Sequence, residues 1–368
     1  MKTQVLPVTP ESLALAGELI RRGELVGMPT ETVYGLAADA GNPLAVRRIF
    51  EAKGRPSDNP IIVHVSSIEE IPPLVTEIPE NARKLMEAYW PGPMTLILPH
   101  SARIPREVSA GLTTVGIRMP SSLAAREIIR HARCPVAAPS ANASGRPSPT
   151  TAAHVLEDMD GKIPLILDDG PCQVGVESSV IDACGEVPVV LRPGAITPEM
   201  IRTLLGDVRV DEHVMQPLQE GETVRSPGMK YRHYAPSART TIVEGPPEAV
   251  IREICLRYDQ AAREGLHPAI LGFVEHDFGG RRTLSLGHAR HPEEAAALLF
   301  ARLRELDELG LDRAFCEAST VSGIGLAVMN RMGRAAGFDV ITAGSGRACG
   351  PEGDPLRRKQ PDLPSRQN

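Results

Sequence analysis

The stretch KGRPSDNPIIVHV at residues 53–65 joins the end of a predicted helix to the start of a predicted strand. Gly54 is typical of a helix end, and the apolar, β-branched run at 61–65 is typical of a buried strand. Lys53 and Arg55 flank the glycine. The dipole of the preceding helix alone can explain two cations at its carboxyl end. Alternatively they form a phosphate clamp, in which a guanidinium supplies a bidentate fork and an ammonium a point charge.

The same alternation of helix and strand signals continues on both sides of this stretch. Strands are predicted at 25–28, 61–65, 95–98, 115–119, 135–139, 164–168, 179–183 and 187–191, and helices at 10–22, 43–54, 121–132 and 197–205. This pattern predicts an α/β domain over residues 1–206. The alternation restarts over 239–346, which predicts a smaller, Rossmann-like α/β domain. Residues 207–238 show no period and are interpreted as a linker or lid, and 347–368 as a flexible tail.

The composition is that of an ordinary globular protein, with 42% hydrophobic and 23% charged residues among 368. The formal charge is −6, and residues 1–206 hold 19 lysines and arginines against 23 aspartates and glutamates. A protein that coats nucleic acid through a wholly basic surface is therefore excluded. The six cysteines show no CxxC spacing, which disfavours a zinc ribbon and favours free thiols in the cytoplasm. No apolar run of about 18 residues and no signal peptide is present, so we expect no membrane association.

Four polar loops lie beside predicted strands: PTETVYGL at 29–36, APSANASGRPSPT at 138–150, GVESSV at 175–180 and LRPGAIT at 191–197. Hydroxyls, an amide and backbone N–H groups in such loops can surround an anion. Each loop taken alone is equally well explained as a solvated turn. The sequence contains no GxxxxGK[ST], GxGxxG, HExxH or GxSxG, which disfavours a P-loop, a dinucleotide fold, a zinc protease and a serine hydrolase.

Taken together and in order, PTETVYGL, KGRPSDNPIIVHV, WPGPMTLIL, TVGIRMP, APSANASGRPSPT, GVESSVID and LRPGAIT resemble the YrdC-like threonylcarbamoyl-adenylate synthases. The resemblance covers about residues 10–205. SPGMKYRHYAP at 226–236 and the second α/β domain resemble the longer, two-domain form of that family. The resemblance implies a YrdC-like twisted mixed sheet with helices, followed by the smaller Rossmann-like domain.

The function implied by the resemblance is that of a nucleotidyltransferase. Such an enzyme condenses L-threonine, bicarbonate and ATP into threonylcarbamoyl-AMP and releases pyrophosphate. A separate transferase complex then uses the product to modify the adenosine beside the anticodon of ANN-decoding tRNAs. Mg²⁺ is expected to arrive with ATP, with no metal ligand from protein side chains. Direct binding of tRNA is expected to be weak or absent, because the first domain is acidic.

The resemblance also implies roles for individual residues. Catalytic positions, which match the KxR and SxN signature pairs, are Lys53, Arg55, Ser140 and Asn142. ATP-binding positions are Arg55, Asn59, Thr114, Ala138, Ser140, Ser148 and Arg192, joined by Lys230, Tyr231 and His233 of the linker. Threonine-binding positions are Thr32, Tyr34, His64, Arg118 and Ser178. Arg118 is expected to pair with the carboxylate of threonine.

Two segments beyond the first domain have open interpretations. The basic and aromatic stretch 226–236 either closes over the pocket and excludes water or packs between the domains. The helix around AVMNRMGRAA at 327–336 carries Asn330, Arg331 and Arg334. It binds a ligand, docks on the first domain, or exposes its charges to solvent.

Two other functional classes remain as alternatives. The first is an RNA-binding translation or ribosome-assembly factor, which the acidic first domain disfavours. The second is the YrdC-like module of the hydrogenase-maturation carbamoyltransferases. Those proteins carry an acylphosphatase-like domain and cysteine-rich zinc motifs ahead of the module, whereas here the resemblance begins near residue 10 and no CxxC occurs.

Overall fold

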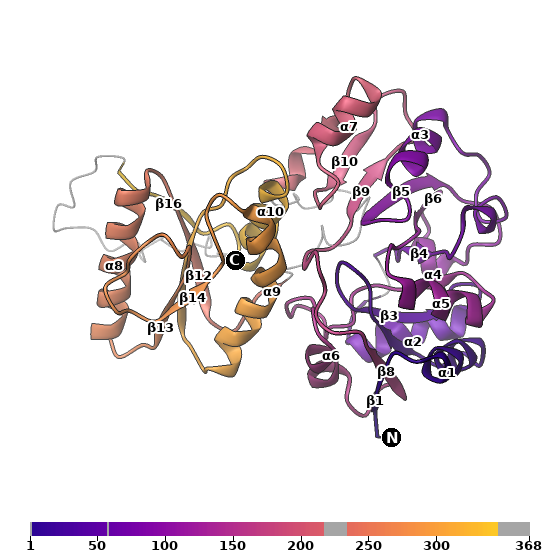
Figure 1. Cartoon of the computed structure of the whole chain (residues 1–368), viewed down its shortest axis with the longest axis horizontal. Coiled ribbons are helices and arrows are strands. Elements are labelled where there is room, and N and C mark those ends of the chain that lie inside the picture. The colour runs from indigo at the N-terminus through magenta and orange to yellow at the C-terminus, as the bar shows by residue number, and fades with distance from the viewer. Residues whose placement is uncertain (1, 57–58, 217–233, 345–368) are drawn as a thin grey trace, which may run out of the picture.

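The computed structural model describes residues 2–56, 59–216 and 234–344. Figure 1 shows two α/β bodies side by side, with the N-terminal body on the right and the C-terminal body on the left. Each body is built on its own sheet. Within the described residues, eleven strands form the N-terminal sheet and five form the C-terminal sheet. Among these residues, no helix is both long enough and apolar enough to cross a membrane.

The N-terminal body alternates strands and helices, as the sequence predicts. Its strands are β1 (Gln4–Pro7), β2 (Val26–Met28), β3 (Gly35–Asp39), β4 (Val63–His64), β5 (Met94–Pro99), β6 (Thr114–Arg118), β7 (Val136–Ala137), β8 (Leu165–Asp168), β9 (Ser179–Asp182), β10 (Val189–Arg192) and β11 (Arg209–Val210). Its helices are α1 (Pro10–Arg21), α2 (Pro43–Lys53), α3 (Glu80–Tyr89), α4 (Arg106–Ser109), α5 (Leu123–Ala132), α6 (Ala152–Met159) and α7 (Pro198–Leu205), with single 3₁₀ turns at Ile68–Glu70 and Glu212–Val214.

The N-terminal sheet is mixed, in the order β1-β8-β2-β3-β7-β4-β6-β5-β9-β10-β11. At its centre β4 runs parallel to β6 and antiparallel to β7. The register pairs His64 with Arg118 at the carboxyl ends of β4 and β6. An isolated bridge joins Gly35 to Ser140 nearby. The predicted mixed sheet is therefore confirmed, and the bridge holds the polar loops at 29–36 and 138–150 side by side.

Helix α2 ends where the sequence predicts. Asn42 caps its first turn by accepting hydrogen bonds from the N–H groups of Leu44 and Ala45. Gly54 follows the last residue in the left-handed conformation, with φ of 62°. Only glycine adopts this conformation without a steric penalty, so the chain turns there. The turn places Lys53 and Arg55 on either side of the helix end.

Several elements differ from the sequence prediction. The strand expected over 61–65 is only two residues long, and the N–H of Ile61 at its start donates to the carbonyl of Val108 outside the sheet. No strand is predicted over 35–39, where the sequence GLAAD contains no β-branched or aromatic residue. Strand β3 nevertheless pairs with both β2 and β7 and is almost wholly buried. Tertiary hydrogen bonding overrides local preference here.

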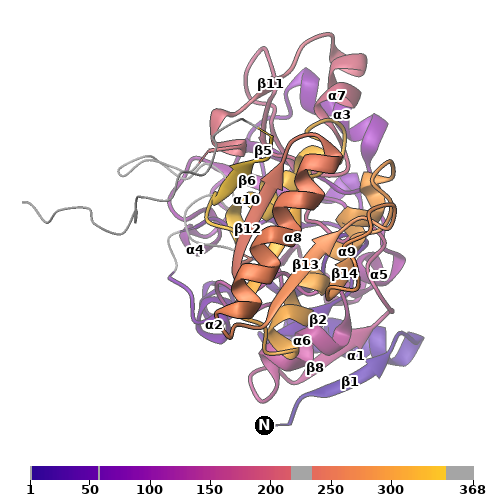
Figure 2. The same cartoon turned by 90° about the vertical axis from the view of Figure 1, so that its left-hand side faces the viewer.

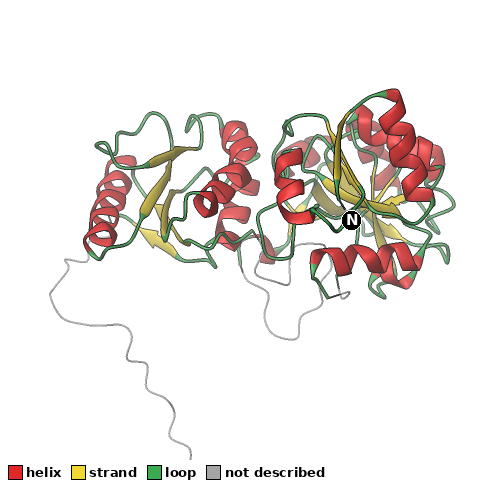
Figure 3. Cartoon of the chain, turned by 90° about the horizontal axis from the view of Figure 1, so that it is seen from below, coloured by secondary structure: helices red, strands yellow, loops and turns green. Residues whose placement is uncertain are grey.

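The C-terminal body is a parallel sheet covered on both faces. Its elements are β12 (Arg239–Glu244), α8 (Pro247–Arg263), β13 (Pro268–Gly272), β14 (Thr283–Ser285), α9 (Pro292–Glu308), β15 (Arg313–Glu317), α10 (Gly325–Ala335) and β16 (Val340–Thr342). The strand order is β14-β13-β15-β12-β16, and all of these neighbouring strands pair in parallel. Helix α8 packs on one face and α9 with α10 on the other (Figures 2 and 3). The predicted second α/β fold is confirmed.

Helices α9 and α10 face the N-terminal body (Figure 1). One apolar cluster contains Val33 and Val176 of that body together with Leu299 and Phe300 of α9. The backbone of Gly175 packs directly on α9: a Cβ at this glycine would lie 2.4 Å from the Cα of Ala297. The two bodies therefore meet through main chain as well as through side chains.

Replacing Gly175 with alanine should destabilise the protein by about 3 kcal/mol, from left-handed strain and steric overlap with α9 together. Gly175 has φ of 76°. Gly170→Ala is the matched control, because Gly170 has φ of 77° and no atom within 4 Å of the added Cβ. The control should cost only about 1 kcal/mol. Chemical denaturation measures both, and equal losses would show that α9 does not pack this closely on Gly175.

Candidate active site

One pocket in the N-terminal body collects most of the predicted site residues. Lys53 and Arg55 reach it from the end of α2, and Tyr234 approaches from the start of the third described segment, 234–344. Ten predicted positions line it: Thr32, Lys53, Arg55, His64, Arg118, Ala138, Ser140, Asn142, Ser178 and Arg192. These residues come from six separate segments of the chain, so the fold assembles them.

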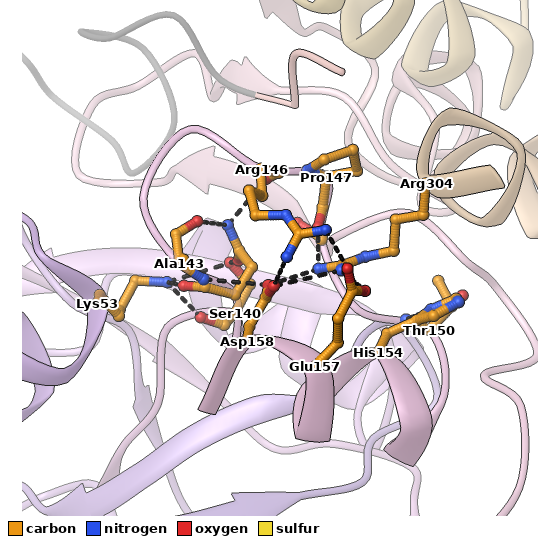
Figure 4. Close-up of polar contacts among 12 residues, drawn as sticks. Lys53, Ser140, Ala143, Arg146, Pro147, Thr150, His154, Glu157, Asp158 and Arg304 are labelled. Atoms are coloured by element: carbon orange, nitrogen blue, oxygen red, sulfur yellow. Dashed lines mark hydrogen bonds and ion pairs between the residues drawn. The ribbon is translucent and has the colours of Figure 1, made fainter. Parts of the chain in front are cut away.

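Lys53 is buried and points into the loop at 138–150. Its Nζ donates to the carbonyl oxygens of Ser140, at 2.5 Å, and Asn142, at 2.7 Å. Figure 4 shows this side chain reaching the loop. Burial, with a second contribution from the Arg55 guanidinium, lowers the pKa of Lys53 to about 7. The two carbonyls therefore fix the orientation of the ammonium group. Its pKa of about 7 means that the charged and neutral forms of Lys53 are both populated near neutral pH.

The SxN pair is held as a unit with this lysine. The hydroxyl of Ser140 donates to Oδ1 of Asn142 at 2.5 Å. The amide of Asn142 donates to the carbonyls of Ala143 and Arg146, both at 2.9 Å. In return, the N–H of Ser144 bonds to the carbonyl of Lys53 at 2.8 Å. The KxR and SxN segments therefore form one hydrogen-bonded structure.

Arg55 lies at the mouth of the same structure. Its guanidinium lies 5.8 Å from the centroid of the Phe50 ring, and one amino group is 3.4 Å from the carbonyl of Asn59. A guanidinium over an aromatic face gains a modest attraction. The guanidinium of Arg55 therefore lies in the pocket lining, together with Ser140 and Asn142 of the loop that Lys53 contacts.

A second polar group surrounds Arg118 at the end of β6. Its guanidinium donates to Thr32 Oγ1 at 2.9 Å and to Glu31 Oε1 at 2.6 Å, and both partners are buried. Burial and then the Arg118 charge lower the pKa of His64 to about 3, so the imidazole is neutral. Within the described chain, Nδ1 of His64 and Nε of Arg118 are buried without a hydrogen-bond partner. Such atoms are candidates for contact with a ligand.

The third wall contains Ser178 and Arg192. Arg192 Nε donates to the Ser178 carbonyl at 3.1 Å, and the Ser178 hydroxyl lies 2.8 Å from that of Thr95. The neighbouring Glu177 also lines the pocket. Burial alone would raise the pKa of this carboxyl, but Arg331 and Arg192 lower it to about 2. Glu177 is thus an anion within a cationic wall.

Four predicted residues lie outside the pocket lining. Ser148 is buried behind the wall and donates to Glu177 at 2.6 Å. Tyr34 is buried and donates to the Gly170 carbonyl at 2.7 Å. Asn59 is fully buried, and neither side-chain atom has a hydrogen-bond partner in the described chain. Thr114 lines a neighbouring apolar pocket, which shares Pro60, Ile61 and Ile62 with the main one.

The predicted linker residues Lys230, Tyr231 and His233 lie outside the described residues. Tyr234, which follows them, is buried in the pocket wall, and its ring centroid lies 5.0 Å from that of Phe300. Sequence reasoning missed Glu31 and Glu177 as pocket-wall or supporting groups. Each stands alone among hydroxyls and apolar residues, in PTETVYGL and GVESSV, which was a usable signal.

Sequence comparison identifies relatives over nearly the whole chain. Residues 18–194 match the family model described as "Telomere recombination", and 196–337 match "Threonylcarbamoyl-AMP synthase, C-terminal domain". The threonylcarbamoyl-AMP synthase of Pyrococcus abyssi is 46% identical over 329 residues, which are 89% of this chain and 95% of the relative. That of Bacillus subtilis is 45% identical over 343 residues, covering 92% and 97%.

Structural comparison agrees. The crystal structure of P. abyssi Sua5 complexed with L-threonine matches with a TM-score of 0.89 and 44% identity, covering 93% of this chain and all of that one. Because it covers 93% of this chain, the match extends across both bodies. On its fold and on relatives matched along most of their length, this chain is an enzyme that belongs to the threonylcarbamoyl-AMP synthase family.

Proposed function

We propose that this enzyme condenses L-threonine, bicarbonate and ATP into threonylcarbamoyl-AMP and pyrophosphate. The observation that carries the proposal is the convergence of Lys53, Arg55, Arg118 and Arg192 on one pocket. The amine of threonine first forms an N–C bond with bicarbonate, and water leaves. A carboxylate oxygen of the resulting carbamate then attacks the α-phosphorus as the bond to pyrophosphate breaks. Such a reaction needs chiefly positioning and charge neutralisation.

The phosphate side is the unit formed by Lys53, Arg55, Ser140 and Asn142. The ammonium and guanidinium supply positive charge, and the Ser140–Asn142 turn holds the ammonium in place through the carbonyl oxygen of Ser140. These donors are already oriented by the loop, so little reorganisation is needed as charge builds on pyrophosphate. Asn59, Thr114, Ala138, Ser148 and Arg192 are proposed to complete the nucleotide site, together with Lys230, Tyr231 and His233.

The threonine side is the group around Arg118. Its buried guanidinium, with Thr32, His64 and Ser178 beside it, suits a carboxylate and a hydroxyl. The neutral imidazole of His64 can accept or donate a hydrogen bond without adding charge. Tyr34 lies behind this group, with its hydroxyl on Gly170, and we assign it a supporting role.

Mg²⁺ is proposed to enter as part of the nucleotide substrate. Among the described residues, no group of three histidine, cysteine, aspartate or glutamate side chains is placed to hold a metal. Glu177, the acidic residue of the pocket lining, is already bonded to Ser148 and Arg331. Mg²⁺ commonly keeps its waters and binds through substrate phosphates.

The product is proposed to pass to a separate tRNA-modifying transferase that acts beside the anticodon. Because the N-terminal domain is acidic, we expect its direct binding to tRNA to be weak or absent. Cys134, Cys172, Cys255 and Cys316 are free thiols, which supports a reducing cytoplasmic location. A lid role for the 226–236 segment stays a proposal: residues 226–233 lie outside the described residues, and Tyr234, which follows them, forms part of the pocket wall.

Pyrophosphate release should require ATP, threonine and bicarbonate together. The measurement is a coupled pyrophosphate assay with each of the three left out in turn, and with serine or valine in place of threonine. Release that ignores threonine or bicarbonate would refute the proposed reaction. A mass spectrum of the product, quenched early because mixed anhydrides hydrolyse, should show threonylcarbamoyl-AMP.

Arg55→Ala should lower the rate of pyrophosphate release about 100-fold, because it removes a charged donor aimed at the phosphates. The fold should survive, since the contact with Phe50 contributes only about 0.5–1 kcal/mol. Arg47→Ala is the matched control: Arg47 lies on α2 but pairs with Glu107 at the surface. Thermal melting checks folding. Wild-type turnover in a folded Arg55→Ala enzyme would place the phosphate clamp elsewhere.

Affinity for ATP should fall as the pH rises above about 7. The free enzyme loses the Lys53 proton through this range, and only the ammonium form attracts the phosphates. The dissociation constant should increase by up to about tenfold per pH unit between 7 and 9. Lys53→Met should bind weakly and show a flat profile over the same range. A wild-type profile as flat as that of the variant would exclude Lys53 as the titrating group.

A further inference from the structure

Two arginines of the C-terminal body are completely buried: Arg304 on α9 and Arg331 on α10, each with 0% of its surface exposed. Arginine is almost never fully buried unless its charge is paired. Both side chains find their carboxylate partners in the N-terminal body, not in their own. The helix with Arg331 therefore docks on the first domain, which decides between the interpretations left open by its sequence.

Arg304 holds the carboxyl side of the loop at 138–150, which we call the phosphate loop because of its proposed role. Its NH2 group donates to Asp158 Oδ2 and to the Pro147 carbonyl, both at 2.7 Å. The same Asp158 oxygen accepts the N–H of Ala143 at 3.1 Å. Figure 4 shows Asp158 between Arg304 and the loop, with Arg146 bonded to its other oxygen. Asp158 thus links α9 to the residue that follows Asn142.

Arg331 holds the opposite wall of the pocket. Its Nε donates to Glu177 Oε2 at 3.0 Å, and NH1 donates to the Pro193 carbonyl at 2.6 Å. Glu177 lines the pocket, and Pro193 follows Arg192, which also lines it. The other Glu177 oxygen accepts the Ser148 hydroxyl. One guanidinium therefore fixes two neighbouring segments of the wall.

The positions of these contacts matter more than their number. Both arginines bond to residues adjoining the phosphate loop or the Glu177–Arg192 wall, so helices of a single domain contact both sides of the pocket. A buried carboxylate that loses one of its cationic partners is less well compensated. Without the two arginines, Asp158 would keep Arg146 and Glu177 would keep the nearby Arg192 as cationic partners. Both carboxylates would then shift toward the remaining arginine, and the segments bonded to them would shift too.

We propose that the C-terminal domain helps to shape the active site. Its Arg304 and Arg331 are positioning residues that set the width of the nucleotide pocket. This inference deepens the proposed function and rests on it. Neither arginine lines the pocket. Each acts through a carboxylate, Arg304 through Asp158 and Arg331 through Glu177. A role limited to domain docking would change stability and leave nucleotide affinity unaltered.

The test compares Arg304→Met and Arg331→Met with Arg302→Met, the matched control. Arg302 lies on α9, as Arg304 does, but it bonds to Ser285 and Glu305 within the C-terminal body. Isothermal titration measures the dissociation constant for α,β-methylene-ATP, which cannot release pyrophosphate. Each of the two positioning variants should bind about tenfold or more weakly. Arg302→Met should stay within about twofold of wild type.

One lysine variant and one double variant separate an effect on positioning from an effect on folding. Arg304→Lys keeps the charge without the fork, and should recover part of the affinity that Arg304→Met loses. If Arg304→Met does not fold, Arg304→Met with Asp158→Asn removes both charges and should restore folding. This double variant should still bind the analogue weakly. Wild-type affinity in it, or in both folded single methionine variants, would overturn the proposal.

The outcomes also separate this inference from the proposed reaction. Analogue binding needs no turnover, so a wild-type enzyme that binds the analogue but releases no pyrophosphate would refute the reaction alone. Variants equal to wild type in affinity would refute the positioning role alone. A wild-type enzyme that binds no analogue would overturn both.

Discussion

The Asp158 carboxylate is the interaction on which much of the structure depends. It is fully buried and accepts from Arg146, from Arg304 and from the backbone of Ala143. A charge in such a place is stable only while its partners stay in position. Helix α6, helix α9 and the phosphate loop are therefore mutually fixed by one side chain. The same logic applies on the other wall to Glu177, which has an arginine from each domain close by.

The pocket that results is cationic inside a protein that is acidic as a whole. Burial lowers the pKa values of Lys53 to about 7 and of Arg192 to about 10, because desolvation disfavours charge. Desolvation makes the positive charge of such a pocket energetically unfavourable, and the proposed polyphosphate substrate would offset this unfavourable free energy on binding. The acidic exterior and the cationic interior together favour a small anion over a nucleic acid.

Much of the fold and most of the pocket could be predicted from the sequence. The end of α2 at Gly54 and the loop SAN at 140–142 carry local signals in their residue types, and the ordered motifs fix the topology by resemblance. Contacts between distant segments carry no such signal. Arg304 is one charge on an amphipathic helix, and its sequence gives no indication that it is buried against Asp158. Strand β3 was missed for the same reason, because its pairing comes from its neighbours.

The approach of Gly175 to helix α9 sets a limit on how this two-domain architecture can change. Where side chains meet, a substitution on one surface can be compensated by a substitution on the other. At Gly175 the neighbours of an added Cβ are main-chain atoms of Ala296 and Ala297, which no substitution of those alanines removes. The spacing of the domains is consequently fixed by the backbone at this point. Substitutions elsewhere at the junction can change its side-chain contacts. They cannot change the distance between Gly175 and the backbone of Ala296 and Ala297, because no side chain lies between them.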